Sequence, residues 1–292
     1  MNFQTAADTF VASLDTPRRR GILAGNTRRL YEAYTARACK SIGTLNLAEI
    51  SNLIVRNYIS ELRQSGLAPS TIQGHFAAFK LVVESVRNYD GDSVYAKKWN
   101  LDYINLPIVN PADQTAPAAS REDIEKALAI PDNELSLFVA LAAASGSRVS
   151  ELMALQIGDV PGEDCLDLTA GVIHVRKTLK TSNAARTIHL PIAFASWLRN
   201  RITHTSGPVF TLPRLTIYRR LAKNNLPAPH SYRRFFTTVR RKAGMNEQVL
   251  RGQLGHALDS SVTDRYSRVS DDVDFIKREV ERCGLGFSLE TV

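Results

Sequence analysis

Apolar residues recur every three to four positions over most of the first hundred residues, which is the spacing of amphipathic helices. This pattern predicts helices over 26–40, 46–64 and 70–88, with turn residues between them. In the second helix, the apolar positions form one stripe, which we interpret as core packing rather than a binding surface. The stripe consists of Leu47, Ile50, Leu53, Ile54, Tyr58 and Leu62.

The helical pattern stops at 104–120, where three prolines and several alanines indicate a linker. Ser120, three residues before Asp123, is a candidate N-cap for a new helix that should end before Pro131. We therefore predict a helical N-terminal domain at 1–111, a linker at 112–119 and a second domain at 120–292.

The second domain combines helical periodicity with one region of strict alternation. Residues 172–176 and 186–190 alternate like the two strands of a hairpin. The predicted fold class is mainly α with a small antiparallel β-sheet (α+β). Helices are expected at 134–144, 148–157, 192–202, 214–224, 230–243, 246–254, 261–267 and 271–282.

The composition is that of a globular protein, with 44% hydrophobic and 23% charged residues. No apolar run approaches the roughly 20 residues of a membrane span, and the N-terminus lacks the pattern of a signal peptide. The three cysteines, Cys39, Cys165 and Cys283, are far apart and form no CxxC pair. We expect a cytoplasmic protein with no membrane association, disulfide framework or zinc site.

Positive charge is concentrated in one part of the chain. The net charge is +8, but the span from Leu168 to Asn246 contains 15 Lys and Arg residues and no Asp or Glu. A solvated face normally mixes both signs, so phosphate binding explains the bias better than a solvated basic face. The same span has no clustered acids to hold a metal pair, which disfavours a two-metal nuclease. No cofactor and no metal are expected.

Four motifs occur in a defined order: SGSRVSELMAL (145–155), KTSNAARTIHLP (180–191), HSYRR (230–234) and LGHALDSSVTDRY (254–266). Together they resemble the signature boxes and lysine hairpin of the tyrosine recombinase family. The resemblance covers most of 120–270. It implies a two-domain DNA clamp in which 1–111 is a SAM-like core-binding domain, although the N-terminal helices carry no diagnostic motif.

Two arginines are candidates for binding a phosphate, because a guanidinium can make a permanently charged, bidentate contact. Arg148 follows a small-residue turn near a predicted helix start, and the resemblance implies that it holds the scissile phosphate. Arg233 shares a helix face with His230, so both can approach one phosphate. The resemblance assigns proton transfer from the nucleophile to His230. Glu151 either orients Arg148 or has an ordinary surface role.

The remaining candidates come from the resemblance. Lys180 corresponds to the general acid that protonates the departing 5′-oxygen, with Lys177 as the alternative. His256, after Leu-Gly, corresponds to a phosphate hydrogen-bond donor. Tyr266 lies ten positions later, one more than the commonest family spacing, and corresponds to the nucleophile. Since the phenol pKa is near 10, this tyrosine needs neighbouring cations and a proton acceptor.

The resemblance therefore implies a metal- and ATP-independent, site-specific DNA recombinase that acts through a 3′-phosphotyrosyl intermediate. The expected partners are double-stranded DNA with specific recombination sites, three further copies in a homotetramer, and accessory DNA-bending or directionality proteins. Its expected location is the nucleoid, or the host cytoplasm for a viral protein. The alternatives are a type IB topoisomerase-like enzyme and a catalytically silent DNA-binding accessory protein.

Overall fold

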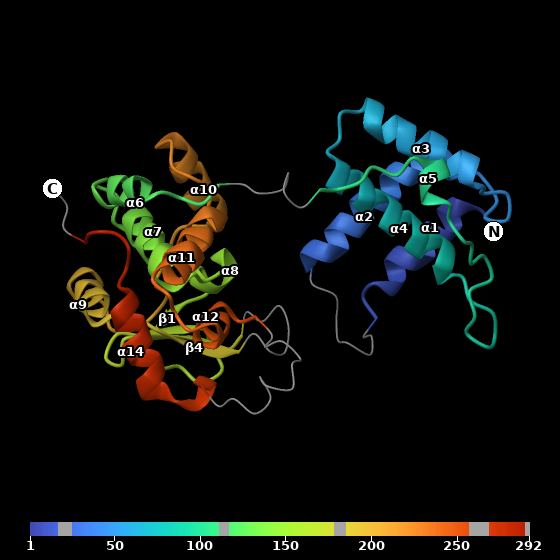
Figure 1. Ribbon diagram of the computed structural model, residues 1–292. Coiled ribbons are helices and arrows are strands. Elements are labelled where there is room, and N and C mark those ends of the chain that lie inside the picture. The colour runs from blue at the N-terminus through green and yellow to red at the C-terminus, as the bar shows by residue number, and fades with distance from the viewer. Residues whose placement is uncertain (17–24, 111–116, 178–184, 257–268, 290–292) are drawn as a thin grey trace. The chain divides into compact units, whose positions relative to one another are not determined.

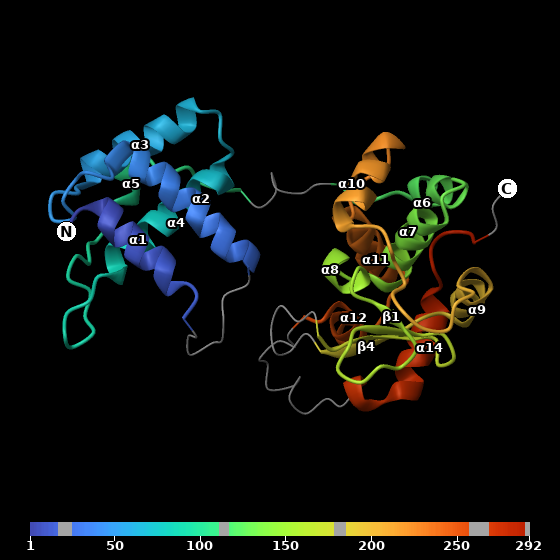
Figure 2. The same ribbon diagram turned by 180° about the vertical axis from the view of Figure 1, so that it is seen from behind.

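The structure is a computed structural model that describes residues 1–16, 25–110, 117–177, 185–256 and 269–289. Its contacts divide the chain into two units, Met1–Thr115 and Ala116–Val292 (Figures 1 and 2). The DNA-binding and catalytic roles of these units remain predictions.

The first unit is built from helices whose starts follow from local capping. The Asn2 side chain accepts a hydrogen bond from the Thr5 amide at 2.9 Å, Ser51 caps the third helix, and Pro69 starts the fourth. Helices α1, α2 and α4 pack on one another, and α5 packs on α3. The helices are α1 (Phe3–Ser13), α2 (Gly25–Ile42), α3 (Asn52–Gln64), α4 (Pro69–Ser85) and α5 (Leu101–Ile104).

Several details of this unit differ from the sequence prediction. Helix α3 begins only at Asn52, because the chain turns ahead of the Ser51 cap and buries Leu47 and Ile50 from that turn. Leu53, assigned to the core, is 52% exposed. Helices α1 and α5 were not predicted; the buried face of α1 is Phe3, Ala6, Ala7 and Phe10.

In the second unit, one helix is surrounded by others and forms the centre of the core. Helix α7 (Asn133–Ser145) is buried from Leu135 to Ser145 and contacts α6, α8, α10 and α11 (Figure 1). Helix α6 starts with a complete capping box between Ser120 and Asp123. The helices around α7 are α6 (Arg121–Leu128), α8 (Val149–Leu152), α10 (Arg214–Lys223) and α11 (His230–Lys242).

A four-stranded sheet in the order β1-β2-β3-β4 lies beside these helices. The predicted hairpin is present as antiparallel β3 and β4, with Val175 opposite Arg186. The sheet is mixed rather than antiparallel, because β1 and β2 pair in parallel. The expected helix at 148–157 was wrong, since α8 ends at Leu152. The strands are β1 (Gln156–Ile157), β2 (Cys165–Asp167), β3 (Val172–Val175) and β4 (Arg186–His189).

Helices α12 and α14 pack against β4. The remaining helices are α9 (Ile192–Arg201), α12 (Glu247–Leu254), the 3₁₀ helix η3 (Val269–Asp271) and α14 (Val273–Cys283). Helix α14 is held within its own unit. Buried Arg240 of α11 donates to the carbonyls of Val280, at 3.1 Å, and Gly284. The expected helix at 261–267 lies outside the described residues.

Candidate active site

Arg148 is positioned by a tight turn between α7 and α8. Gly146 ends α7 with a φ of 63°, and the Ser145 hydroxyl accepts the Ser147 amide hydrogen at 3.2 Å. A Cβ on Gly146 would lie 2.5 Å from the Phe236 ring. The turn therefore requires glycine for its backbone conformation and for packing. It places Arg148 at the N-cap of α8 with 26% of its side chain exposed.

Glu151 lies one turn later and its side chain is fully buried. One carboxylate oxygen accepts the Arg148 amide hydrogen at 2.7 Å, and the other accepts a hydrogen bond from Arg148 Nη1 at 2.7 Å. Burial by itself would raise the pKa of Glu151, but hydrogen bonds and charges from Arg186 and Arg148 outweigh it and hold this pKa below its usual range. A buried ionised carboxylate thus fixes both the backbone and the side chain of Arg148.

The other partner of Glu151, Arg186 on β4, was not among the predicted site residues. Its Nη2 lies 2.8 Å from Glu151 Oε2, and its Nε donates to the Gln253 carbonyl at 2.7 Å. Only 6% of the Arg186 side chain is exposed. Its position in the quoted lysine-hairpin motif was visible in the sequence, but the pairing with an acid 35 residues away was not.

Arg233, one turn into α11, lies among backbone carbonyls. It donates to the carbonyls of Gly146 and Leu254, each at 2.6 Å, and its Nη2 lies 3.2 Å from His256 Nε2. Burial and the neighbouring charge of Arg148 lower the pKa of Arg233 to about 10. The guanidinium therefore remains charged at neutral pH, and its orientation is fixed by the ends of α7 and α12.

The two candidate histidines are kept neutral by this environment. Partial desolvation, followed by the charges of Arg234, Arg233 and Arg148, lowers the pKa of His230. Desolvation and nearby arginines, Arg233 first, likewise lower the pKa of His256. Because Arg233 donates to His256 Nε2, we assign the proton of neutral His256 to Nδ1, which is then a hydrogen-bond donor.

Two of the predicted residues, Lys180 and Tyr266, lie outside the described residues. The alternative lysine, Lys177, is described, and its Nζ lies 2.7 and 2.8 Å from the two carboxylate oxygens of Glu163. Lys177 thus already has a carboxylate partner. The structure brings together the other five candidates, Arg148, Glu151, His230, Arg233 and His256, by contact or through their charges.

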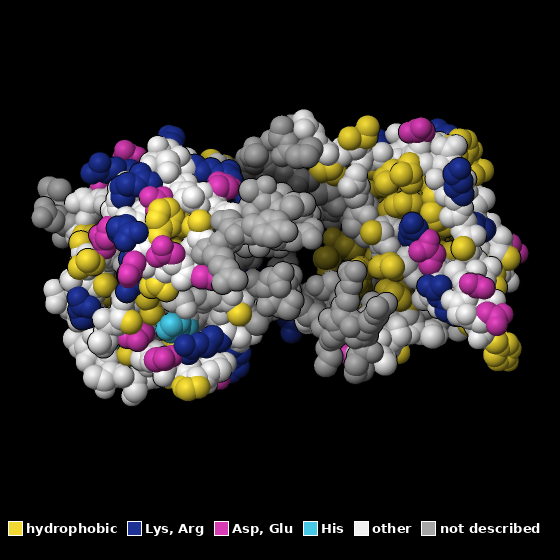
Figure 3. All heavy atoms as spheres, turned by 60° about the horizontal axis from the view of Figure 1, so that its bottom comes forward, with side chains coloured by type: hydrophobic (Ala, Val, Ile, Leu, Met, Phe, Trp, Pro, Cys, Tyr) yellow, Lys and Arg dark blue, Asp and Glu magenta, His cyan; other side chains and the backbone are white. Residues whose placement is uncertain are grey.

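The basic stretch of the sequence is less one-sided in space than along the chain. Several of its cations pair with acids from outside the span, and Figure 3 shows Lys and Arg side chains interspersed with Asp and Glu. Pairing with these acids therefore neutralises part of the positive charge of the span. The pairs described are Arg176 with Asp159, Lys177 with Glu163, Arg186 with Glu151, Arg220 with Asp132 and Arg241 with Glu247.

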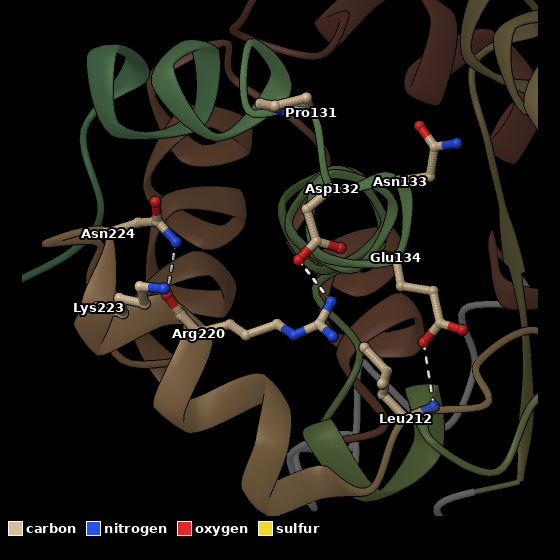
Figure 4. A pocket seen from close by; sticks show the side chains of 8 residues that line it. All are labelled: Pro131, Asp132, Asn133, Glu134, Leu212, Arg220, Lys223 and Asn224. Atoms are coloured by element: carbon tan, nitrogen blue, oxygen red, sulfur yellow. Dashed lines mark hydrogen bonds and ion pairs between the residues drawn. The ribbon is translucent and has the colours of Figure 1, made fainter.

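A hollow of about 690 Å³ lies elsewhere, between the start of α7 and α10 (Figure 4). Its charged groups are engaged in the wall, since Arg220 Nη1 lies 2.5 Å from Asp132 and the Glu134 carboxylate accepts the Leu212 amide hydrogen at 3.0 Å. Of the candidate site residues that the structure describes, none lines it. We assign it no part in the chemistry.

Within the described ranges, no group of three or more His, Cys, Asp or Glu side chains is arranged to hold a metal ion. None of the helices described is both long and apolar enough to cross a membrane.

Residues 119–272, more than half of the chain, match the phage integrase family. This chain belongs to that family of tyrosine recombinases. The tyrosine recombinase XerA of Pyrococcus horikoshii is 26% identical to this family member over 249 residues, which is 80% of each chain.

Solved structures of integrases share the fold of this recombinase. The Tn1549 transposon integrase in complex with transposon right end DNA is 18% identical, with a TM-score of 0.60, and the match covers 97% of this chain and 99% of the other. A lambda integrase dimer bound to a COC′ core site is 14% identical, with a TM-score of 0.63, and the match covers 92% of this chain and 96% of the other.

In this recombinase, the electrostatics of the arrangement favour binding of an anion such as a phosphate. The guanidinium groups of Arg148 and Arg186 pair with the single carboxylate of Glu151, and that of Arg233 lies within range of its charge, so the cluster has net positive charge. The groups are held by buried hydrogen bonds before any substrate arrives. Such preorganised donors stabilise developing charge without the cost of reorganisation.

Proposed function

We propose that this family member is a site-specific DNA recombinase of the integrase or excisionase type, which cleaves and rejoins strands through a 3′-phosphotyrosyl intermediate. The observation that carries the proposal is the convergence of Arg148 and Arg233, fixed by Glu151 and by the carbonyls of Gly146 and Leu254. Two oriented guanidinium groups can bind the two nonbridging oxygens of one phosphodiester.

In the proposed step, the Tyr266 oxygen attacks the phosphorus and the bond from phosphorus to the 5′-oxygen breaks. His230, neutral because its pKa is lowered, accepts the phenolic proton. Lys180 protonates the departing 5′-oxygen, and Nδ1 of His256 donates a hydrogen bond to the phosphate. The phosphotyrosine ester conserves the bond energy, so rejoining by a 5′-hydroxyl needs neither ATP nor a metal.

We further propose that the first unit is a core-binding domain that binds DNA together with the second. The fold match to the DNA-bound Tn1549 integrase covers 97% of this chain, which supports DNA as a partner of both units. Phosphate contacts release counterions, so noncovalent affinity should fall steeply as salt concentration rises. A salt-insensitive affinity would contradict this part of the proposal.

The deciding experiment is incubation with nicked suicide DNA that carries the cognate site, followed by denaturing electrophoresis. Wild-type protein should form a covalent adduct in EDTA without ATP, and Tyr266→Phe should form none. Tyr218→Phe is the matched control, because Tyr218 lies on α10 and interacts with Arg214 rather than with the candidate site. An adduct that persists in Tyr266→Phe would place the nucleophile elsewhere.

The same assay separates the alternative functions. Tight DNA binding without any adduct would favour a silent accessory protein, and site-independent relaxation of supercoils by single chains would favour a type IB topoisomerase-like enzyme. We propose a homotetramer on synapsed DNA, assisted by accessory DNA-bending or directionality proteins. Crosslinking on synapsed sites should yield four-chain species, and recovery of single chains alone would contradict the tetramer.

A further inference from the structure

Arg186 links three separate parts of the candidate site. From β4 it reaches both oxygens of Glu151, with Nη2 at 2.8 Å from Oε2 and Nη1 at 3.2 Å from Oε1. Its Nε donates to the Gln253 carbonyl in the last turn of α12, just before the Leu-Gly-His turn that presents His256. One side chain therefore bridges the hairpin, the Arg148 turn and the end of α12.

Arg186 packs closely against the turn that ends α12. Gly255, the C-cap residue of α12, has a φ of 65°, and a Cβ there would lie 2.8 Å from Arg186 Nη1. The glycine thus serves two needs, a left-handed backbone and close approach to a guanidinium. His256, the next residue, is therefore positioned by a turn that contacts Arg186.

Arg186 also determines how Glu151 is shared. Within the described part of the chain, Glu151 accepts two hydrogen bonds from Arg148 and two from Arg186. A fully buried carboxylate with one of these partners removed would be incompletely satisfied, and its local structure would shift to compensate. The orientation of Arg148 thus depends on Arg186, whose guanidinium donates to Glu151 and to the Gln253 carbonyl of α12.

We infer that Arg186 is a positioning residue, which orients Arg148 through Glu151 and the His256 turn through Gln253. This inference rests on the proposed function and deepens it. Arg186 is engaged with protein groups and only 6% of its side chain is exposed, so its effect on the reaction is indirect. Through Arg186, strand β4 is connected to the Arg148 turn and to the end of α12.

The test compares Arg186→Met with Arg176→Met. Arg176 follows β3, opposite the start of β4, and pairs with Asp159 at 2.6 Å with 30% of its side chain exposed. Both variants remove one arginine and one ion pair at the same end of the hairpin, but of the two arginines only Arg186 touches the site. Two quantities are measured: the single-turnover rate of adduct formation at saturating protein, and noncovalent DNA affinity in a Tyr266→Phe background.

We expect Arg186→Met to slow adduct formation by roughly 10- to 100-fold, because small misplacements of reacting groups have effects of this size. Its noncovalent affinity should match that of Arg176→Met, whose rate should stay near wild type. Arg186→Lys keeps the charge but loses the planar fork and the Nε donor, so its rate should also remain low. The lysine variant decides the question even if the methionine variant does not fold.

A pH profile adds a readout that general destabilisation would not produce. Arg148 on the same turn and Arg186 on β4 face Glu151, and Arg233 on α11 lies within range of its charge. His256, after α12, lies close enough to these three arginines and to Arg251 for their charges to lower its pKa. Without Arg186 the pKa of Glu151 should rise. In an acid titration, Glu151 would then become protonated at a higher pH than it does in the wild-type protein. The rate of Arg186→Met should therefore fall on the acidic side at a higher pH than the wild-type rate does.

Three results would overturn the inference. The first is adduct formation by Arg186→Met at the same rate as by Arg176→Met. The second is a wild-type rate of adduct formation by Arg186→Lys. The third is an Arg186→Met variant that loses DNA affinity but keeps its rate of adduct formation. A wild-type protein that forms no Tyr266-dependent adduct contradicts the proposed function itself, and this result is seen before any arginine is altered.

Discussion

Substituting Gly146 with alanine should destabilise the second unit through two separable effects. The residue has a φ of 63°, which L-residues with a Cβ adopt at a cost of about 1–2 kcal/mol. The added Cβ would also lie 2.5 Å from one Phe236 ring carbon and 2.9 Å from another. The Phe236 side chain is 1% exposed, so it has little room to move away.

Overpacking of a buried site typically costs about 1–3 kcal/mol, so the two effects together predict a loss of about 2–5 kcal/mol in the free energy of unfolding. Two other glycines separate the contributions. Gly162 has a φ of 78°, and a Cβ added there would meet no described atom within 4 Å, so Gly162→Ala should show the backbone cost alone. Gly252, inside α12 with open space around it, should gain about 0.5–1 kcal/mol as alanine.

The chain contains two tryptophans, one in each unit, so tryptophan fluorescence can follow the unfolding of one unit at a time. In a Trp99→Phe background, the fluorescence of Trp197 on α9 reports urea unfolding of the second unit. Gly146→Ala should lower the free energy of unfolding by about 1–3 kcal/mol more than Gly162→Ala does. Equal losses in the two variants would refute the steric argument at Phe236.

Three further predictions use urea unfolding, with Trp99 fluorescence in a Trp197→Phe background reporting the first unit and the assay above reporting the second. Burial, and secondarily the charge of Arg37, lowers the pKa of His75 to about 4, so the unfolded chain binds more protons between about pH 6.5 and 4. Stability of the first unit should be fully present above that window and fall by up to ~3 kcal/mol as pH drops through it, whereas His75→Gln should lose this dependence. Gln253 is 3% exposed, and neither side-chain amide atom has a hydrogen-bond partner among the described residues. Gln253→Met should therefore stabilise the second unit by about 1 kcal/mol. A destabilised variant would contradict this. Ser120→Ala removes the capping box with Asp123 and should destabilise the same unit by about 1 kcal/mol; an unchanged midpoint would show that the cap contributes nothing.

Much of the fold followed from periodicity and capping signals. The helices α9, α10, α11, α12 and α14 lie within about two residues of their predicted bounds, because each has an apolar face and a clear start or stop. Helix α1 was missed because its short apolar face is interrupted by small and polar residues. Strands β1 and β2 have two and three residues, too few for alternation to register.

The candidate site was partly predictable, because motifs fix residues that are close along the chain. Glu151 is three residues from Arg148, and that contact has helical geometry. The role of Arg186 depends on the sheet register and on where α12 ends, neither of which is set by local sequence. The basic span shows the same limit, since Asp159 and Glu163, just outside it, reach back to neutralise Arg176 and Lys177.

The pairing of Val175 with Arg186 determines which changes the hairpin can tolerate during evolution. Side chains on a strand alternate between faces, so a slip of one residue within β4 would exchange Arg186 for Thr187 and separate Glu151 from its partner. None of the paired positions, Val172–Val175 and Arg186–His189, lies between Lys177 and Ala185. We therefore expect related chains to differ in length between these two positions while keeping the spacing from Arg186 to the end of β4 unchanged.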